Sequence, residues 1–458
     1  MRYSRSLSCP SWILCASEMP ITGASGTIHR LTILLALISP FIASLAFAEE
    51  YSFDISETEK KPYSLKGYGE FRPVYISLDR TAAFYKLKFY DQGNLADTNE
   101  LNFKLQPEAS YEYGIAQLYG RGNFDFTRNY TGWAADSSLY EGYLSVKPSV
   151  SLDLLVGQKT LKWGKGYAWN PVAFADRPKN PDDPEIPREG YAIVMADYTL
   201  SLAGPLRTIG LSPVLIPVSG DLNKDLGSGN HLNAAGKLYL LLYDTDLDFM
   251  LLTEASGLAG YGMDFSRNLL PELEIHGETA VVPHHQKARI DQSGNVFQET
   301  TNALSYLLGA RYQTKTDAVL IAEYYHNGKG YQAAEMEEFV GLAGLAYSTY
   351  LANGNNALIQ RASRASANAY GAVNPMLDYI CFRASQPEPF NILYLTPALT
   401  CVVNPGDGSY SIASEILYTR ITNLELRLKA MTLLGDSKSE FGAKAGDLRV
   451  ELRARYYF

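Results

Sequence analysis

The chain has 458 residues, including 33 Tyr and 37 Gly, and only 19% of it is charged. That length allows two or three ordinary soluble domains or one large barrel, and a charged share below the roughly 25% of an average soluble domain favours the barrel. The formal net charge of −9 argues against a nucleic-acid partner, which selects a basic surface.

The N-terminal segment is typical of a secretory signal. Arg30 precedes an apolar run that ends in Ala46-Phe47-Ala48, the small-x-small pattern found before a signal-peptidase cleavage site. We interpret residues 1–48 as a leader with its signal peptide, and residues 49–63 as a periplasmic segment. The alternative is an uncleaved N-terminal membrane anchor.

Two of the four cysteines lie in this leader, so an exported chain keeps only Cys381 and Cys401. A sparse, even pair in an exported protein is compatible with one disulfide. After residue 50, no apolar run reaches the roughly 18 residues that a membrane-spanning helix needs. Any passage through a membrane would therefore use strands.

The rest of the chain alternates between apolar and polar residues in segments of about ten, separated by turn signals. In "LNFKLQPEASYEY", residues 101–113, the apolar and polar side chains fall on opposite faces of a strand. An initial strand lies between 64 and 91. Further strands are predicted at 115–126, 137–147, 150–160, 191–202, 208–218, 232–243, 246–257, 259–268, 272–282, 302–313, 316–327, 409–420, 423–434 and 447–458.

Loop lengths support one barrel over residues 64–458. Counting back from the last strand, the short gaps become inner turns and the long gaps become outer loops, with only the outer connection near 258 tight. We therefore predict an all-β fold, a closed antiparallel transmembrane β-barrel of about sixteen strands. Eighteen is the alternative, with 82–91 and 388–400 as the extra strands.

The longest outer connection, residues 328–408, is predicted to be partly helical, because "YQAAEMEEFVGLAGLAYSTYLANG" is rich in helix-forming residues. A disulfide between Cys381 and Cys401 would close its second half. Connections of this length are usually functional or disordered. A lid, a receptor surface and a helix that dips into the mouth are three alternative interpretations of this segment.

The last strand, "DLRVELRARYYF", alternates up to the final residue. Leu448, Leu452 and Phe458 share one face with the other apolar residues, whereas the arginines share the opposite face with Glu451. One face suits lipid and the other suits water.

These features resemble the outer-membrane β-barrels of Gram-negative bacteria, and the porins among them. The resemblance implies that Tyr456 and Phe458 belong to the C-terminal signal that the barrel-assembly machinery reads, and that the chain resides in the cell outer membrane. A homotrimer is retained as the assembly. The stretch "GQKTLKWGKG", residues 157–166, is also similar to a G-Q-x-x-x-x-W-G pattern of porin-like and exopolysaccharide-export barrels.

The third outer connection, residues 161–190, is the candidate constriction. The resemblance to porins implies that it folds into the lumen, and its prolines suit a stiff segment outside the strand ladder. An external surface loop of the same composition is the alternative. Its candidate pore-lining acids are Asp176, Asp182, Asp183 and Glu185.

A basic stripe is predicted on the lumen wall that would face these acids. The alternative is that Glu70, Glu425 and Glu451 neutralise the stripe as cross-strand pairs. Its members come from the last two strands and the first: Arg427, Lys429, Arg449, Arg453, Arg455, Lys66 and Arg72.

Catalytic and cofactor motifs are absent from the sequence. His276 lies between Glu274 and Glu278 without a second cluster at ligand spacing, which favours a polar ladder over a metal site. We therefore expect no enzyme activity, metal or cofactor. The expected function is a porin-like channel for small hydrophilic solutes, and the alternative is a non-conducting barrel that uses 328–408 as a receptor, adhesion or assembly surface.

Deleting Phe458 should impair assembly, because the resemblance makes this residue both the end of the closing strand and part of the assembly signal. Surface exposure and the heat-dependent gel mobility of folded barrels measure the effect. Normal folding and normal surface exposure of the truncated chain would contradict the prediction.

Overall fold

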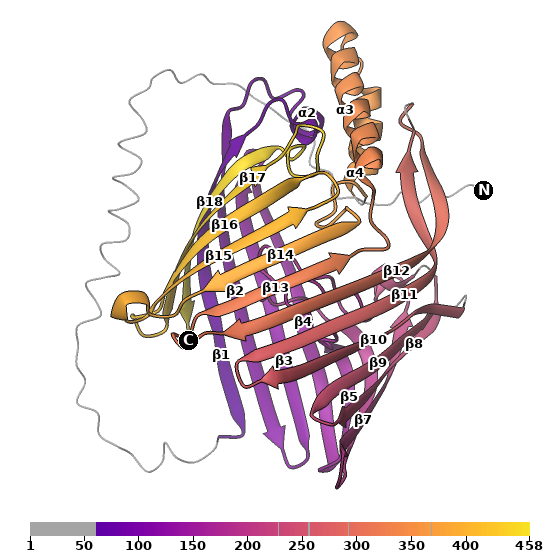
Figure 1. The fold of residues 1–458 in the computed structure, drawn as a ribbon, viewed down its shortest axis with the longest axis vertical. Helices are drawn as coiled ribbons and strands as arrows, with labels where there is room; N and C mark the ends of the chain where they lie inside the picture. Colours follow the sequence, from indigo (N-terminus) through magenta and orange to yellow (C-terminus); the bar gives the residue numbers. More distant parts are fainter. Residues whose placement is uncertain (1–60, 228, 255–256, 292, 368) are drawn as a thin grey trace. The chain divides into compact units, whose positions relative to one another are not determined.

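The computed structural model describes residues 61–458 except 228, 255–256, 292 and 368, and Pro62–Phe458 forms a compact unit. The predicted leader, and all but the end of the predicted periplasmic segment, lie outside the described residues. Figure 1 shows the unit as a barrel of strands with helices at one end. We call that end outer. The opposite end, which holds Tyr63 and Phe458, is called inner.

In the part of the chain that the structure describes, eighteen antiparallel strands form one closed sheet, in which each strand pairs with the next and the last pairs with the first. They are β1 (Tyr63–Leu78), β2 (Asp97–Tyr113), β3 (Ala116–Asn129), β4 (Gly132–Ser149), β5 (Leu152–Lys159), β6 (Tyr191–Ser201), β7 (Leu206–Val218), β8 (His231–Leu242), β9 (Thr245–Glu254), β10 (Gly257–Leu270), β11 (Leu273–Ile290), β12 (Val296–Gln313), β13 (Val319–His326), β14 (Asp378–Ser385), β15 (Leu395–Asn404), β16 (Ser409–Tyr418), β17 (Leu424–Leu434) and β18 (Gly446–Tyr457).

The sixteen predicted strands are all present, but the preferred count of sixteen is too low. The two additional strands, β14 and β15, lie inside the predicted loop 328–408. The inward side chains Tyr379, Cys381 and Val402 are buried and apolar, so the period of two is lost in this part of the sequence. Because an even number of strands was missed, every other strand keeps its direction. The other connections therefore lie at the inner or outer end predicted for them.

The alternative count of eighteen agrees with the structure, although one of its additional strands was misplaced. Residues 82–91, read there as a strand, contain the short helix α2 (Ala83–Lys88). The other additional strand of that count, 388–400, overlaps β15 and the turn that precedes it.

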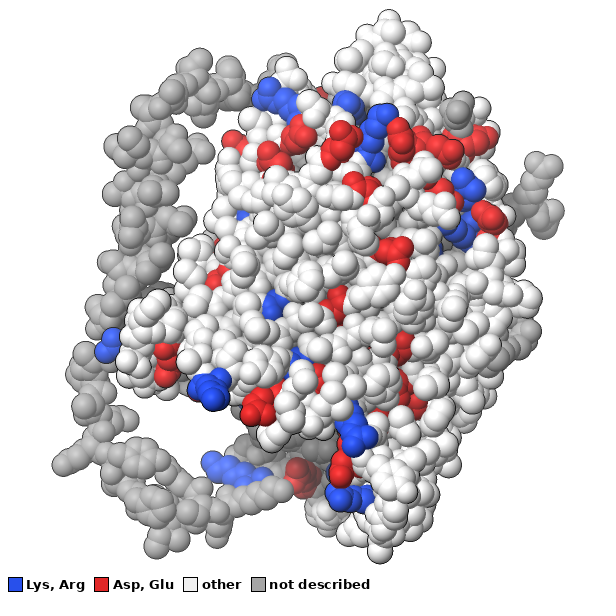
Figure 2. All heavy atoms as spheres, viewed as in Figure 1, with Lys and Arg blue, Asp and Glu red and all other residues white. Residues whose placement is uncertain are grey.

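Alternation sorts the side chains of β18 as predicted. Arg453 and Glu451 face the lumen and are 4% and 5% exposed, whereas Leu452 and Tyr456 face outward and are 42% and 52% exposed. Similar apolar side chains cover the outside of the other strands, and in Figure 2 the charged groups gather along the upper rim above a mainly white band. An outer surface of this kind is suited to lipid.

Three helices pack together at the outer end: α2, α3 (Ala333–Asn353) and α4 (Ala357–Ala367). The ring of Phe339 in α3 lies 5.5 Å from that of Phe84 and 4.6 Å from that of Tyr370, measured between centroids. We call these helices the cap. No helix among the described residues is long and apolar enough to cross a membrane.

The base of α3 is fixed by charge. The side chain of Glu335 accepts a hydrogen bond from the backbone N–H of Gln332, which completes a capping box, and it also lies 2.7 Å from Lys287 Nζ of β11. Arg289 of β11 adds contacts to Glu335 and Glu338. The outer part of β11 therefore supports the helix.

The predicted disulfide is not formed, because Cys381 and Cys401 are both free. Cys381 is opposite Val402 and faces inward, whereas Cys401 is opposite Phe382, which faces outward and is 52% exposed. The two thiols therefore lie on opposite faces of the sheet, an arrangement that the bond geometry of a disulfide does not accommodate.

Both cysteines should accordingly remain reduced in the folded protein. After denaturation without a reductant, a maleimide reagent should add to two thiols per exported chain, as counted by intact-mass spectrometry. A chain that gains thiols only after reduction would contradict the structure.

Candidate functional site

The connection between β5 and β6, residues 160–190, lies inside the barrel, and we call it the lumen loop. Its first half contacts inward side chains of β9, β11 and β13, and its tip contacts β17 and β18. The loop thus joins two separate parts of the inner wall. The alternative prediction of an external surface loop is wrong.

Two buried glutamates bind the first half of the loop through its backbone. Glu278 Oε1 accepts hydrogen bonds from the N–H groups of Lys165 at 2.6 Å and Gly166 at 2.7 Å. Glu323 accepts from the N–H groups of Tyr167 and Ala168, the latter at 2.9 Å. Hydrogen bonds to charged acceptors are the strong ones, and here they replace water around carboxylates that are 3% and 2% exposed.

Glycine is required where the loop approaches these carboxylates. A Cβ on Gly166 would lie 2.1 Å from the carbonyl oxygen of Trp169. Gly164 has a φ of +93°, and a Cβ there would lie 2.9 Å from an oxygen of Glu278. The local sequence "WGKG" thus gives the backbone both its conformation and its close contact with the wall.

Asp176 holds the beginning of the lumen loop. Its carboxylate accepts hydrogen bonds from the N–H groups of Leu161 at 2.9 Å and Trp163 at 3.0 Å. Burial raises the pKa of Asp176, although the same N–H groups and Arg188 act to lower it. The predicted acid therefore organises the loop and is itself buried.

Lysine side chains add two further links. Lys165 Nζ lies 2.9 Å from Asp248 of β9, and although burial lowers the pKa of Lys165, this carboxylate raises it overall. Lys179 donates to the carbonyl oxygen of Gly166 within the loop, and burial lowers the pKa of its ammonium.

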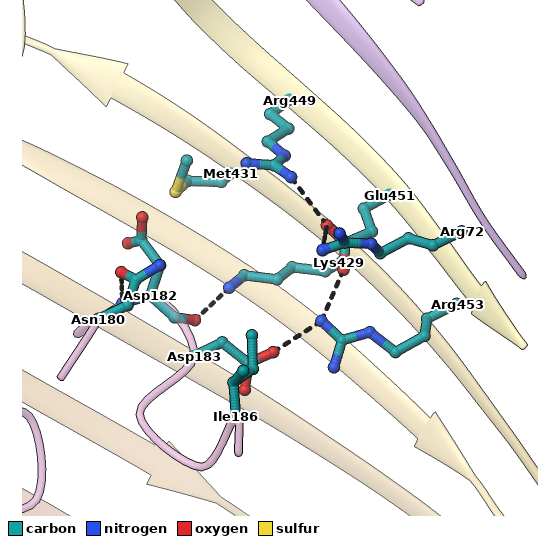
Figure 3. Close-up of a pocket in the computed structure, with 10 residues that line it drawn as sticks. All are labelled: Arg72, Asn180, Asp182, Asp183, Ile186, Lys429, Met431, Arg449, Glu451 and Arg453. Atoms are coloured by element: carbon teal, nitrogen blue, oxygen red, sulfur yellow. Dashed lines mark hydrogen bonds and ion pairs between the residues drawn. The ribbon is translucent and has the colours of Figure 1, made fainter. Parts of the chain in front are cut away.

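The loop tip is bound to the opposite, basic part of the wall (Figure 3). Arg453 of β18 donates to Asp183 at 2.6 Å, Arg427 of β17 lies 3.8 Å from the same carboxylate, and Lys429 donates to the carbonyl oxygen of Asp182. Burial acts to raise the pKa of Asp183, but Arg453, followed by Arg427 and Lys429, holds it below its ordinary value. We call the contact of Asp183 with Arg453 the latch.

Beside the latch lies a cavity of about 60 Å³. That volume holds only a few water molecules. Four basic and three acidic side chains are among its lining residues, as Figure 3 shows: Arg72, Asn180, Asp182, Asp183, Ile186, Lys429, Met431, Arg449, Glu451 and Arg453.

The structure brings most of the predicted lumen residues together. Both proposed partners of the basic stripe are present, because Asp183 contacts it from the loop while Glu70 binds Arg455 at 2.7 Å from β1. Lys66 lies apart, with a side chain that is 64% exposed and 3.8 Å from Glu108. Glu185 is exposed on the lumen loop and does not belong to the latch.

The acidic part of the wall was missed by sequence reasoning. Glu323 and Asp248 gave no distinct signal, because the partners of Glu323 are backbone N–H groups that leave no mark in sequence. His276, predicted to join a polar ladder, contacts Glu323 with its Nε2 at 2.9 Å. Within the described residues, no group of three or more His, Cys, Asp or Glu side chains is placed to hold a metal.

Comparison with known proteins identifies the fold. OccAB1 of Acinetobacter baumannii is 12% identical, with 86% of this chain and 96% of that chain covered at a TM-score of 0.51. A BenF-like porin of Pseudomonas fluorescens Pf-5 is 8% identical, with 86% and 98% covered at a TM-score of 0.51. No family model and no curated protein sequence matches the chain. The chain has a porin-like transmembrane barrel fold, whose closed sheet and apolar exterior belong in an outer membrane.

Replacing Glu278 by Gln should loosen the lumen loop, since an amide cannot offer two anionic oxygens to the N–H groups of Lys165, Gly166 and Val172. We expect a loss of about 3 kcal/mol in loop docking. Trp163 and Trp169 lie in the loop and are 3% exposed, so their emission should shift to the red and acrylamide should quench it more strongly.

The matched control is Glu274→Gln on the same strand, whose side chain is 29% exposed and accepts a hydrogen bond from Ser266. This variant should retain the emission of the wild type. Equal effects of the two substitutions would contradict a specific role for Glu278.

Proposed function

We propose that the protein is an outer-membrane channel through which small hydrophilic solutes diffuse. The observation that carries the proposal is the lumen loop, which is bound through its first half and its tip to charged parts of the wall, with a small polar cavity beside the tip that we take as part of the solute passage. A barrel that served only as a rigid support would not need a charged, water-accessible interior. We propose no enzymatic activity for this protein.

Opposing charges give this passage a transverse electric field. Arg449 and Arg72 face it from one wall with side chains 38% and 23% exposed, and Asp182 faces it from the loop tip. Charged side chains around a narrow lumen set which solutes enter and how they are oriented. Dipolar and charged solutes should therefore pass differently from neutral ones of equal size.

The C-terminus supports the proposed contact with the barrel-assembly machinery. Phe458 exchanges two backbone hydrogen bonds with Gly67 of β1, at 3.0 and 3.1 Å, so the terminal residue closes the sheet. Its side chain is 52% exposed and that of Tyr456 is equally exposed. Both therefore remain accessible to an assembly factor. A homotrimer in the bilayer belongs to the same proposal.

The cap favours a second candidate, a non-conducting barrel that acts as a surface scaffold. Its apolar cluster extends from Phe339 and Met376 down to Trp169 of the lumen loop, which stacks on Tyr325 with ring centroids 5.3 Å apart. Packed side chains therefore fill part of the outer mouth. A fully blocked lumen would leave the cap as the functional surface.

Single-channel recording of the purified protein in a planar bilayer distinguishes the channel from the non-conducting scaffold. Stable conductance steps, with a reversal potential that shifts under a salt gradient, are expected for the channel. Consistent silence from protein that is folded by its heat-dependent gel mobility would favour the scaffold.

The latch predicts a pH dependence of that conductance. Because the pKa of Asp183 is lowered in the fold, its contribution to tip binding is complete above the ordinary carboxyl pKa of 3.8 and is lost as pH falls through the lower value. Conductance should therefore stay constant at neutral and mildly acidic pH, and become larger or noisier in strong acid.

Asp183→Asn should show the acid-like behaviour already at neutral pH, with a change of roughly two-fold in conductance or open-channel noise. The matched control is Glu185→Gln on the same loop, which leaves the latch intact. An unchanged Asp183→Asn channel would show that the tip contact does not control the passage.

A further inference from the structure

We propose that the inner turn between β14 and β15, residues 386–394, is an anchor that inserts apolar side chains into the inner leaflet of the outer membrane. The partner is phospholipid at the boundary between headgroups and acyl chains. The inference depends on the barrel spanning a bilayer and is independent of solute passage.

This turn differs from the others at the inner end of the barrel. It is the longest of them, whereas the remaining seven have five residues or fewer. It contains the short helix η3 (Pro389–Asn391), which Figure 1 draws at the left edge of the barrel. In Figure 2 the same place is a mainly white lobe.

Four large apolar side chains are exposed in this short stretch. Phe390 is 94% exposed, Leu393 59%, Ile392 49% and Tyr394 48%. The other inner turns expose such residues one at a time, for example Val150 or Ile421. Neighbouring exposed apolar residues of this size mark a contact surface.

The backbone holds these side chains outward. Glu388, Phe390, Asn391 and Tyr394 have φ between 48° and 64°, a left-handed conformation that residues other than glycine adopt at a cost. Glu388 Oε1 accepts a hydrogen bond from the N–H of Tyr394 at 3.0 Å. The turn is therefore built to display its apolar residues.

Hydrogen bonds also fix the turn to its surroundings. Glu388 N–H donates to Leu395 O at 2.7 Å, and the Gln386 side chain donates to Thr316 O of the adjacent inner turn at 2.5 Å. Glu388 is the one charged residue of the turn; it is exposed, and one oxygen of its carboxylate accepts the N–H of Tyr394. The turn therefore carries a single charge beside its four exposed apolar side chains, and that carboxylate would lie at the level of the lipid headgroups.

Continuity with the lipid-facing wall identifies the occupant. Residues of β12, β13, β14 and β15, among them the outward side chains of the two strands that the turn connects, line an apolar groove of about 380 Å³; no residue of the turn itself lines it. Leu399 and Phe382 of this groove are 49% and 52% exposed on the face that meets lipid. Apolar side chains that extend such a surface to the rim, with Tyr394 among them, match the interfacial region of a bilayer.

Lipid quenching of an introduced tryptophan tests the proposal. Trp133 faces outward and is 56% exposed, so Trp133→Phe removes the native lipid-facing fluorophore, and Trp163 and Trp169 remain buried. The Phe390→Trp substitution is made in this background, and the variant protein is reconstituted at low protein density with phospholipids brominated near the headgroup. We expect lipid bromine to quench the emission of the introduced tryptophan about two-fold or more as strongly as that of the control variant described next.

The matched control is Lys315→Trp in the adjacent polar turn 314–318, which should be quenched by aqueous iodide and little by lipid bromine. Leu393→Trp serves as the second reporter if Phe390→Trp does not fold, and heat-dependent gel mobility shows whether it has. Quenching of native Trp133 by the same lipids establishes that the barrel is inserted, even if no conductance is observed.

Three results would overturn the anchor. Iodide quenching of Phe390→Trp equal to that of Lys315→Trp would place the turn in water. Protection from both quenchers would show a protein partner or a second copy of the chain. Absence of Trp133 quenching would mean that the barrel does not span the bilayer.

Discussion

A strand in hydrocarbon cannot leave its backbone N–H and C=O groups without partners, and the architecture of this protein depends on that constraint. An open sheet would expose two unpaired edges to lipid, so the sheet must close. Pairing of β18 with β1, completed by the backbone bonds of Phe458 to Gly67, provides that closure. A closed sheet of eighteen strands in turn encloses an interior, and the alternation of side chains makes the outside apolar and much of the inside polar.

The same constraint governs the lumen loop. A segment drawn into the barrel exchanges bulk water for the protein wall, and its N–H groups need acceptors there. Glu278 and Glu323 supply anionic oxygens at one wall, and the side chain of Asp176 satisfies N–H groups within the loop. At the other wall the relation is reversed, because Arg453 is the donor and Asp183 of the loop is the acceptor. Opposite charges on the two walls thus hold one loop across the interior.

Features that depend on neighbouring residues could be predicted from the sequence, whereas contacts between residues far apart in the chain could not. The faces of β18 follow from its own alternation, and Asp183 and Arg453 were each placed in the lumen by sequence, although 270 residues separate them. Their direct contact requires the fold. The preferred count of sixteen missed β14 and β15 because Tyr379, Cys381 and Val402 pack against the interior, which removes the polar half of the pattern; only the alternative count of eighteen reached part of β15. Glu323 was missed because it binds backbone, which has no residue signature.

The lumen loop spans the barrel from one wall to the other, and a cross-link tests this arrangement most directly. With Cys381 and Cys401 replaced by Ser, the pair Asp183→Cys and Arg453→Cys is treated with dibromobimane, and peptides are identified by mass spectrometry. The structure predicts a joined peptide for this pair and none when Arg453→Cys is replaced by Arg311→Cys on the inward face of β12. Absence of the first product, in protein that is folded and labelled at both thiols, would contradict a loop bound across the lumen.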